Sequence, residues 1–318
     1  MNTIHEALSH CVVKTTVPDL PEPYRGKVRD VYSLPHNKLA FIASDRVSAF
    51  DHVLRQAIPY KGQILNIIAA YFFDNVRDII ETHLLDVPHP NVTIARKCNM
   101  LPVEVVLRRY LTGHAWRTYR SGKRELCGVT LPDGMVENQR FDKPILTPAT
   151  KADEGHDEDI SEKEILAKGI IDGPTWNKVR NTAFQLFERG TQMAIDRGLL
   201  LVDTKYEFGI YDGRLILADE VHTPDSSRYF YADGFEERLG KGQKQKQLSK
   251  EFIREWLMEH NFQGLNGQTL PELPDPFRIQ VYERYSELYE LIIGKPFEPR
   301  PTLNFNAELS QILNVDQK

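Results

Sequence analysis

One hairpin constrains this chain more than any other stretch of its sequence. Residues 203–220 read DTKYEFGIYDGRLILADE, with Asp212-Gly213 near the middle. An Asp-Gly pair between two apolar runs is a strong signal for a tight β-hairpin turn. The first strand places Asp203, Lys205 and Glu207 on one face, because successive side chains on a strand point to opposite sides. The second strand is apolar until it ends in two adjacent acids, which is typical of a strand buried on both faces.

The charges of this hairpin have two interpretations. A strand with one solvent-facing side also alternates charged and apolar residues. Carboxylates in a buried sheet, however, are costly unless they are paired or hold a cation. Two acids from neighbouring strands with a lysine between them can hold hydrated Mg²⁺ and an anionic substrate. A two-residue turn puts Glu220 on the face of Glu207, whereas a longer loop or a bulge puts Asp219 there, because a one-residue slip exchanges the faces.

The composition is that of an ordinary globular protein and disfavours several classes of partner. The chain has 318 residues, 41% hydrophobic and 27% charged, with a formal net charge of −5. This length suits one large domain or two modest ones, and the negative charge gives no global basic field for nucleic acid. The basic run 241–247 lacks aromatic residues, and we interpret it as a solvated loop. No stretch approaches the roughly 18 apolar residues of a membrane span, so we expect neither a nucleic acid nor a membrane as partner.

The N-terminus and the cysteines predict a cytoplasmic location. Residues 1–23 lack a long apolar core and a small-residue cleavage site, so they do not resemble a signal peptide. Cys11, Cys98 and Cys127 are odd in number and widely spaced, which argues against a disulfide framework and against a zinc cluster. A reducing compartment is the simplest expectation for such a chain.

Strand patterns dominate the first hundred residues, and helical patterns become frequent after them. Apolar or alternating runs bounded by turn residues predict strands at 24–33, 38–44, 91–97 and 103–110. Apolar spacings of three and four, with capping signals, predict helices at 62–80, from a Ser161–Glu164 capping box, from Pro174 to Gly198, at 250–262 and at 276–294. Antiparallel hairpins mixed with helices predict the α+β fold class. The GxGxxG and GxxxxGK[ST] phosphate loops are both absent from the sequence.

Two segments carry cations beside glycine. In YRGKVRDVY (24–32), Gly26 lets the backbone approach a ligand, and Lys27 and Arg29 alternate on one face, so the segment can cover nucleotide phosphates. In 101–119, a strand runs into Arg108 and Arg109 and then into a Thr-Gly-His turn, a combination suited to binding phosphate. Solvated surface strands and polar strand ends produce the same patterns.

Three more segments place polar residues beside predicted elements. The first is ASDRVSAFDH (43–52), which follows an apolar strand and contains Asp45, Arg46, Ser48 and Asp51. Strand ends are common places for a site and also for a plain loop. The second, 147–161, contains Lys151 and His156. A structural role near a helix start fits this histidine at least as well as a ligand-binding role. The third, 221–230, contains Asp225 and Arg228, which follow the hairpin acids closely enough to face the same pocket.

Taken together, these segments resemble the SAICAR synthetases, the phosphoribosylaminoimidazole-succinocarboxamide synthases. The resemblance extends from about residue 20 to about residue 260, and it lies in YRGKVRDVY, SDRVSAFD, LPVEVVLRRYLTGHAW, TPATKADEGHDE, VDTKYEFG and LADEVHTPDSSR. It implies a two-lobed, ATP-grasp-like α+β fold with an antiparallel N-terminal sheet, a larger mixed C-terminal lobe and an ATP cleft between them. The implied lobes are residues 1–105, which cover ATP, and residues 106–318, which carry catalysis, substrate binding and the C-terminal helices.

The resemblance also implies a reaction. ATP, the carboxylated aminoimidazole ribonucleotide (CAIR) and L-aspartate give the succinocarboxamide ribonucleotide (SAICAR), ADP and phosphate, in de novo purine synthesis. The CAIR carboxylate is activated as an acyl phosphate, which the aspartate amine attacks. Such a reaction needs Mg²⁺, cations on the transferred phosphoryl group and two anionic substrates held in line.

The matching motifs imply that the nucleotide side of the site comprises a loop and the hairpin acids. Gly26, Lys27 and Arg29 resemble the loop that covers the ATP phosphates, and Lys151 resembles a lysine near the nucleotide or the substrate. Glu207 and Asp219 resemble acids associated with Mg²⁺, with Glu220 as a possible third. The separation of Glu207 and Asp219 matches the family, which favours the bulged register of the hairpin over the two-residue turn.

The substrate side draws on the other motifs. Lys205 resembles the group that faces the reacting carboxylate, and with Glu207 and Asp219 it makes up the implied catalytic set. Residues that resemble CAIR contacts are Arg108, His114, Lys205, Asp225 and Arg228. Many members of the family have Ser where this chain has His114, and a histidine can still donate a hydrogen bond to phosphate. Asp45, Ser48 and Asp51 belong to a motif near the imidazole and aspartate sites.

Other functions predict features that this sequence lacks. A protein kinase needs an HRD…N catalytic loop and a DFG motif, and neither is present. A nucleotide-binding regulator or an RNA-binding protein predicts broken metal acids or a basic stripe, whereas the hairpin acids here are intact. Another ATP-dependent ligase, or a small-molecule kinase of the same architecture, stays as the alternative. The sequence leaves open whether the protein is a monomer or a homo-oligomer.

Overall fold

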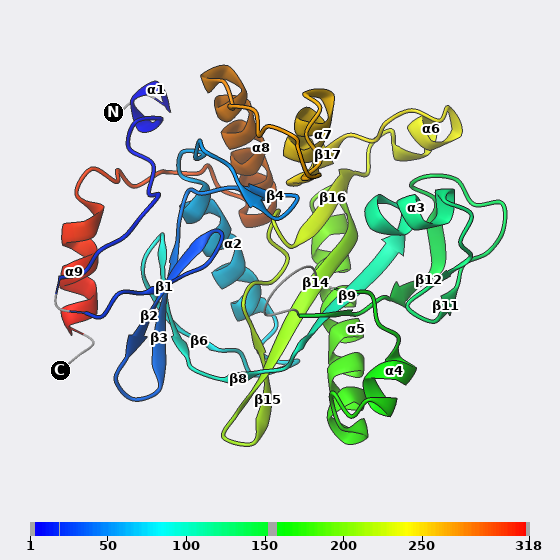
Figure 1. The fold of residues 1–318 in the computed structure, drawn as a ribbon, viewed down its shortest axis with the longest axis horizontal. Coiled ribbons are helices and arrows are strands. Elements are labelled where there is room, and N and C mark those ends of the chain that lie inside the picture. Colours follow the sequence, from blue (N-terminus) through cyan, green and yellow to red (C-terminus); the bar gives the residue numbers. More distant parts are fainter. Residues whose placement is uncertain (1–3, 19, 152–157, 316–318) are drawn as a thin grey trace. The chain divides into compact units, whose positions relative to one another are not determined.

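The chain divides into two compact units in the computed structural model, which describes residues 4–18, 20–151 and 158–315 (Figure 1). Unit 1 comprises Met1–Tyr71, His83–Lys97 and Ser249–Lys318, and unit 2 comprises Phe72–Thr82 and Cys98–Leu248. In the described part of the chain, every helix is too short or too polar to span a bilayer. Antiparallel sheets and helices build both units, which confirms the predicted α+β class.

Unit 1 is built on a five-stranded antiparallel sheet with the strand order β1-β2-β3-β7-β6. These strands are β1 (Tyr24–Arg25), β2 (Arg29–Leu34), β3 (Lys38–Ala43), β7 (Val92–Arg96) and β6 (Leu84–His89). The short pair β4 (Ser48–Ala49) and β5 (His52–Val53) follows β3. Helix α2 (Lys61–Asn75) begins in this unit. The helices that lie wholly in it are α1 (Ile4–Ala7), α7 (Glu251–Glu259), α8 (Asp275–Ile293) and α9 (Phe305–Val315).

Helix α9 covers this sheet, as Figure 1 shows for the red helix beside β1, β2 and β3. Its buried side chains Phe305, Leu309 and Leu313 pack in one cluster with Tyr32 and Ile42 of the sheet. Apolar residues that recur every four positions place one stripe of a helix against the core. The C-terminal segment is therefore part of the unit-1 core.

Unit 2 is built on an eight-stranded sheet whose central path is β12-β9-β14-β16-β17. These strands are β12 (Arg140–Leu146), β9 (Val103–Tyr110), β14 (Leu199–Tyr211), β16 (Ser227–Tyr231) and β17 (Gln247–Leu248). Beside them, β13 (Ala149–Thr150) pairs with β9, while β8 (Asn99–Met100) and β15 (Arg214–Ala218) pair with β14. The remaining elements are α3 (Gly113–Arg120), α4 (Glu162–Ala167), α5 (Gly173–Ile195), α6 (Phe235–Gly240) and the small pair β10 (Glu125–Leu126) and β11 (Val129–Thr130).

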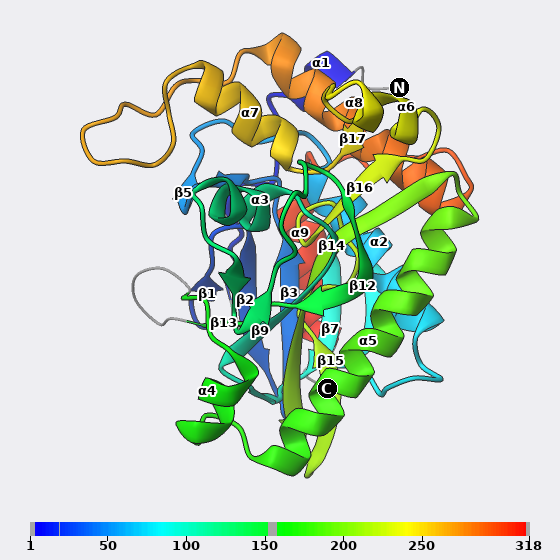
Figure 2. The same cartoon turned by 90° about the vertical axis from the view of Figure 1, so that its right-hand side faces the viewer.

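Helix α5 supports the central strand β14 from one side, along which it runs in Figure 2. Asp172 caps its first turn by accepting a hydrogen bond from the backbone of Thr175, with Pro174 just inside the helix. An apolar stripe on this helix is buried, at Trp176, Val179, Ala183, Phe187 and Ala194. The stripe is thus part of the core. The predicted capping box of Ser161 and Glu164 is present at the start of α4.

The predicted helix over 62–80 is shorter in the structure. Helix α2 (Lys61–Asn75) starts one residue earlier and ends five residues sooner. Arg189 Nη1 donates a hydrogen bond to the carbonyl oxygen of Asn75 at 2.5 Å, which satisfies an acceptor that the next turn of the helix would otherwise use. A contact with a residue more than a hundred positions away therefore helps to end this helix.

The bulged register favoured for the 203–220 hairpin is wrong. Tyr211 pairs with Arg214 and Glu207 pairs with Ala218, which is the register of a two-residue turn. Asp212 and Gly213 have φ values of 49° and 73°, as a type I′ turn requires. Asp219 nevertheless reaches Lys205, because β15 ends at Ala218 and Asp219 adopts a left-handed conformation with φ 63°.

Candidate functional site

Strands β9 and β14 bring three of the predicted site residues, Arg108, Lys205 and Glu207, onto one face of the unit-2 sheet. They run antiparallel, with Asp203 opposite Arg108 and Lys205 opposite Val106. Since alternate residues share a face, Glu104 and Arg108 of β9 lie on the same side as Asp203, Lys205 and Glu207 of β14. The opposite face is apolar and buried, and it carries Tyr206 and Phe208. The charged face is therefore one continuous surface with two groups of contacts.

The first group joins lysines to carboxylates. Lys205 Nζ donates to Glu104 Oε1 at 2.8 Å and to Glu207 Oε1, and it lies 3.6 Å from Asp219 Oδ2. Lys151 Nζ donates to the other carboxylate oxygen of Glu207. Glu207 is only 3% exposed, so its charge would be costly without these two ammonium groups. We call Glu104, Lys151, Lys205, Glu207 and Asp219 the lysine–carboxylate cluster.

This environment shifts two pKa values. Burial lowers the pKa of Lys205, but the negative charges of Glu207, Asp219 and Glu104 outweigh it and hold the pKa well above its usual value. Burial raises the pKa of Glu207, and Asp219 raises it further, while Lys205 and Lys151 act against both. Lys205 is therefore a cation at neutral pH, suited to stabilising negative charge rather than to removing a proton.

The two acids at the end of β15 have different partners. Asp219 faces Lys205, whereas the buried Glu220 accepts a hydrogen bond from the hydroxyl of Thr223. The geometry thus brings Asp219, rather than Glu220, into the lysine–carboxylate cluster.

A bound Mg²⁺ commonly uses one or two protein carboxylates together with phosphate oxygens and water. Glu207 and Asp219 both contact Lys205, so the structure brings two carboxylates together at one point. Across the described residues, no three His, Cys, Asp or Glu side chains form a ready metal cage. The donor set consequently fits an ion that arrives with a nucleotide better than a permanently held ion.

The second group joins two arginines through one acid. Asp203 accepts from Arg108 Nη1 at 3.0 Å and from Arg228 Nε at 3.0 Å, and Arg228 Nη2 lies 2.9 Å from the same carboxylate. Arg108 Nε also donates to Thr147 Oγ1 at 2.8 Å. We call Arg108, Asp203 and Arg228 the arginine pair with its acid. Two guanidinium groups on one carboxylate leave a net positive charge, which suits a phosphate ligand.

The N-terminus of α3 lies against this pair. Gly113 has φ 56°, and a Cβ atom placed on it would lie 1.9 Å from Arg228 Nη1. Only glycine fits here without moving the guanidinium. His114, the next residue, makes a 2.7 Å contact from Nε2 to Asp159 Oδ2, and this hydrogen bond is the main cause that lowers the pKa of Asp159. The predicted Thr-Gly-His turn is therefore the first turn of a helix.

Other predicted residues lie in unit 1. The backbone N–H of Gly26 donates to the carbonyl of Arg29 at 2.8 Å, which closes a tight turn between β1 and β2. Lys27 Nζ forms an exposed ion pair with Asp51, so the glycine-containing turn contacts the segment 43–52. Ser48 lies in β4 and is nearly buried. The structure thus brings together two segments that the sequence treats separately.

Asp45 has a structural environment. It is 1% exposed, and it accepts hydrogen bonds from the backbone N–H of Val12 at 2.7 Å and of Gly62 at 2.9 Å. Burial is the largest influence on its carboxyl group and raises the pKa to about 6. Both oxygens therefore hold backbone segments of unit 1 together.

Asp225 and His156 are the last two residues that the sequence analysis singled out. Asp225 is half-buried in the turn before β16, between Thr223 and Ser226, whose side chains hydrogen bond across it. His156 lies outside the described residues.

Sequence reasoning missed the groups that hold the site residues in place. Glu104 binds Lys205, Thr147 binds Arg108, and Asp159 binds His114. Asp203 stands out by its alternation with Lys205 and Glu207, but no role was assigned to it. The alternation of Val103, Glu104 and Val105 is a signal for Glu104, because it puts a carboxylate on the face of Arg108.

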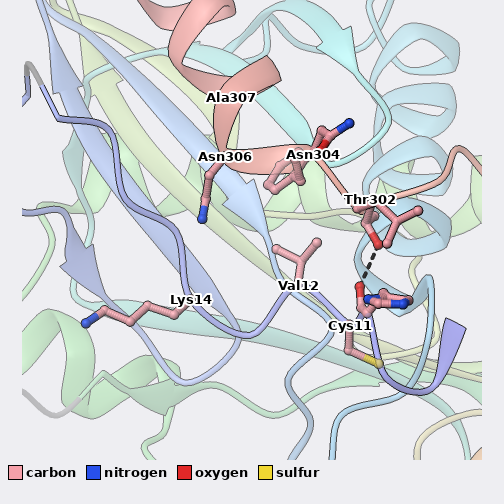
Figure 3. A pocket seen from close by; sticks show the side chains of 10 residues that line it. Cys11, Val12, Lys14, Thr302, Asn304, Asn306 and Ala307 are labelled. Carbon is pink, nitrogen blue, oxygen red and sulfur yellow. Dashed lines mark hydrogen bonds between the residues drawn. The ribbon is translucent and has the colours of Figure 1, made fainter.

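A cavity of about 330 Å³ lies elsewhere in unit 1 (Figure 3). Residues 10–12, Lys14 and residues 302–307 line it, and Thr302 Oγ1 donates to the carbonyl of His10 at 2.6 Å. None of the predicted site residues is among its lining residues. The cavity lies between an N-terminal and a C-terminal segment of the chain and is not the candidate site.

The fold and this surface define a class of protein in which the charged face of an antiparallel sheet suits small anionic ligands. A family model described as SAICAR synthetase matches residues 22–268. The phosphoribosylaminoimidazole-succinocarboxamide synthase of Bacteroides thetaiotaomicron is 54% identical over 289 residues, which are 91% of this chain and 92% of that protein. The synthase of Flavobacterium psychrophilum is 52% identical over 296 residues, 92% and 94% of the two chains. The chain therefore belongs to the SAICAR synthetase family.

Solved structures agree with this assignment. A SAICAR synthase from Saccharomyces cerevisiae, described as complexed with SAICAR, aligns with a TM-score of 0.78 at 31% identity, over 91% of this chain and all of that one. A type-2 SAICAR synthetase in complex with ADP aligns with a TM-score of 0.66 at 25% identity, over 87% of this chain and all of that one. Membership of the family makes the chain an enzyme, a ligase of purine biosynthesis.

Proposed function

We propose that this chain joins L-aspartate to CAIR with the consumption of ATP, and forms SAICAR, ADP and phosphate through an acyl phosphate. The observation that carries the proposal is the shared sheet face, on which Lys205 and Glu207 lie beside the arginine pair with its acid. One end of this face suits a carboxylate under activation, and the other end suits a phosphate. Relatives described as complexed with SAICAR and with ADP support the same pair of ligands.

CAIR would span the two ends of this face. Asp203 and Glu207 are four residues apart on β14, about 13 Å at roughly 3.3 Å per residue, and a ribonucleotide is long enough to bridge them. Arg108 and Arg228 bind its phosphate group, with a hydrogen bond from His114. Asp225 is a further contact to CAIR, away from the phosphate. Lys205 faces its carboxylate.

ATP would bind through cations from both predicted lobes. Gly26, Lys27 and Arg29, in the predicted ATP-covering lobe 1–105, cover its phosphates. Lys151, in the predicted catalytic lobe 106–318, would release the Glu207 carboxylate and bind a phosphate oxygen of ATP instead. An ammonium group moves between a carboxylate and a phosphate at little cost, because both are anionic oxygen ligands.

Glu207 and Asp219 would hold Mg²⁺ together with the nucleotide. When bound, the ion would neutralise charge on the transferring phosphoryl group. Lys205 would hold the CAIR carboxylate beside the γ-phosphate. Because Lys205 stays protonated, it stabilises the charge on the acyl group without accepting a proton.

The aspartate substrate would bind near the segment 43–52. Ser48 and Asp51 are the proposed contacts, since a hydroxyl and a carboxylate can receive the substrate's ammonium group. Asp45 supports this segment through its two backbone hydrogen bonds.

An assay of ADP release tests the proposal, with ATP, Mg²⁺, CAIR and aspartate present and one substrate omitted at a time. Release should need both CAIR and aspartate, and release without aspartate would favour a small-molecule kinase. Glu207→Gln should reduce turnover about 100- to 1,000-fold and leave the fold intact. Glu237→Gln is the matched control, because Glu237 is exposed and pairs with Lys241 on α6. Turnover by Glu207→Gln at the rate of this control would refute the role of Glu207.

A further inference from the structure

A buried histidine lies three residues after Asp219, on the apolar side of the unit-2 sheet. His222 is fully buried, and its Nε2 atom lies 2.8 Å from the hydroxyl of Tyr206. Tyr206 stands between Lys205 and Glu207 in β14, so its side chain points to the face opposite theirs. The imidazole also stacks on Phe72, with ring centroids 4.8 Å apart and an interplanar angle of 28°. The histidine thus contacts the back of the strand that carries the site.

Helix α5 and β16 close the remaining sides of this pocket. A Cβ atom placed on Gly190 of α5 would lie 1.7 Å from His222 Cε1, so the helix backbone touches the imidazole ring directly. The hydroxyl of Tyr229 donates to the backbone carbonyl of His222 at 2.8 Å. Side chain and backbone are both held, and the ring has no room to turn.

The chain between strand and histidine carries Asp219. Before it, Ala218 pairs with Glu207 in the ladder. Asp219 and His222 both have left-handed backbone conformations, with φ 63° and 56°. Residues 219–222 are held at one end by the strand pairing of Ala218 and at the other end by the buried side chain of His222. So short a segment has little conformational freedom, and its two fixed ends therefore determine the position of the Asp219 carboxylate.

We propose that His222 is a positioning residue, which holds Asp219 beside Glu207 so that both acids can bind one divalent cation. This inference rests on the proposed metal role of Glu207 and Asp219. Outer groups that orient metal-binding carboxylates commonly change metal affinity 10- to 100-fold when they are altered. His222 cannot reach the substrate itself, because β14 lies between its ring and the charged face.

The electrostatics around His222 agree with a neutral ring that is held in one position. Burial lowers the pKa of His222 to about 3, so the ring stays neutral wherever the enzyme works. Among the described residues, Nδ1 finds no hydrogen-bond partner, and the ring is held by packing and by the single contact with Tyr206. Removing either support should therefore let the ring, and Asp219 with it, move.

Binding of Mn²⁺ in the presence of ADP provides the test, with free Mn²⁺ followed by electron paramagnetic resonance and no turnover required. Gly190→Ala forces the imidazole to move, and Tyr206→Phe removes only the hydroxyl. Gly173→Ala is the matched control, because it lies in the same helix and its added Cβ would meet nothing within 4 Å. We expect Gly190→Ala to raise the Mn²⁺ dissociation constant about tenfold and Tyr206→Phe to raise it severalfold, with CAIR affinity changed less than twofold in both.

The outcomes separate this inference from the metal assignment. Asp219→Asn should weaken Mn²⁺ binding, and unchanged binding would overturn the metal role and the inference with it. If Asp219→Asn weakens binding while Gly190→Ala and Tyr206→Phe match the control, only the positioning role of His222 is refuted. Should Gly190→Ala not fold, Tyr206→Phe decides alone. A merely structural defect would lower the affinity for CAIR and for Mn²⁺ alike, and that result also refutes positioning.

Discussion

Replacing Asp203 with Asn should destabilise unit 2 and give it a new dependence on phosphate. Asp203 is 5% exposed and neutralises Arg108 and Arg228 through contacts of 2.9 to 3.0 Å. Removing one partner of a buried ion pair typically costs 3–5 kcal/mol, because the remaining charge is left uncompensated. We expect about 3 kcal/mol, near the lower limit, because Arg228 is partly exposed to water.

The melting temperature measures this loss. For a domain of this size, 1 kcal/mol corresponds to roughly 2–4 °C, so Asp203→Asn should melt about 6–12 °C lower than the native protein. Asp212→Asn is the matched control in the same hairpin, since Asp212 is exposed and Asn-Gly also suits a type I′ turn. The control should melt close to the native protein.

Inorganic phosphate should reverse much of the loss. Two uncompensated guanidinium groups attract an anion more strongly than two groups already held by a carboxylate. A phosphate concentration 100 times the dissociation constant stabilises the folded state by about 2.7 kcal/mol. Chloride at equal ionic strength controls for screening. If phosphate raises the melting temperature of Asp203→Asn no more than that of the native protein, the charge argument is wrong.

Three further substitutions have defined outcomes. Gly113→Ala pushes on Arg228 and should raise the KM for CAIR at least tenfold, whereas Gly122→Ala, also at positive φ but with nothing within 4 Å, should cost stability alone. His114→Ala should raise the KM for CAIR severalfold, and an unchanged KM would show that the ring does not reach the phosphate. Burial raises the pKa of Asp45 to about 6. As pH rises, the folded state therefore keeps the carboxyl proton of Asp45 up to a higher pH than the unfolded chain does. Stability should therefore fall by about 3 kcal/mol as pH rises from about 4 to above 6, and Asp45→Asn should lack this slope in urea titrations.

The sequence correctly predicted those structural elements that depend only on residues close together in the chain. The Asp-Gly turn, the Ser161–Glu164 capping box and the helix that begins at Pro174 all appear, because each depends on residues within a few positions. The end of α2 was not predictable in this way, since it involves Arg189 from a distant helix. Helix α9 is absent from the prediction, although Phe305, Leu309 and Leu313 recur at a helical spacing.

The site shows the same division between local and distant causes. Alternation along β14 placed Asp203, Lys205 and Glu207 on one face, and the structure confirms it. The partners of these residues come from other strands and loops, as Glu104 does from β9. Strand pairing depends on the whole sheet, so no short motif could say which carboxylate meets Lys205.

The hairpin register shows where the alternation rule stops applying. In an extended strand, Glu220 would share the face of Glu207, and the resemblance to the family therefore favoured a bulge that would bring Asp219 there. The ladder instead ends at Ala218, and the left-handed conformation of Asp219 redirects its side chain without any slip in the strands. Aspartate and asparagine enter this conformation more readily than most residues. A shorter acid at 219 thus allows a regular two-residue turn and a charged contact with Lys205 in the same hairpin.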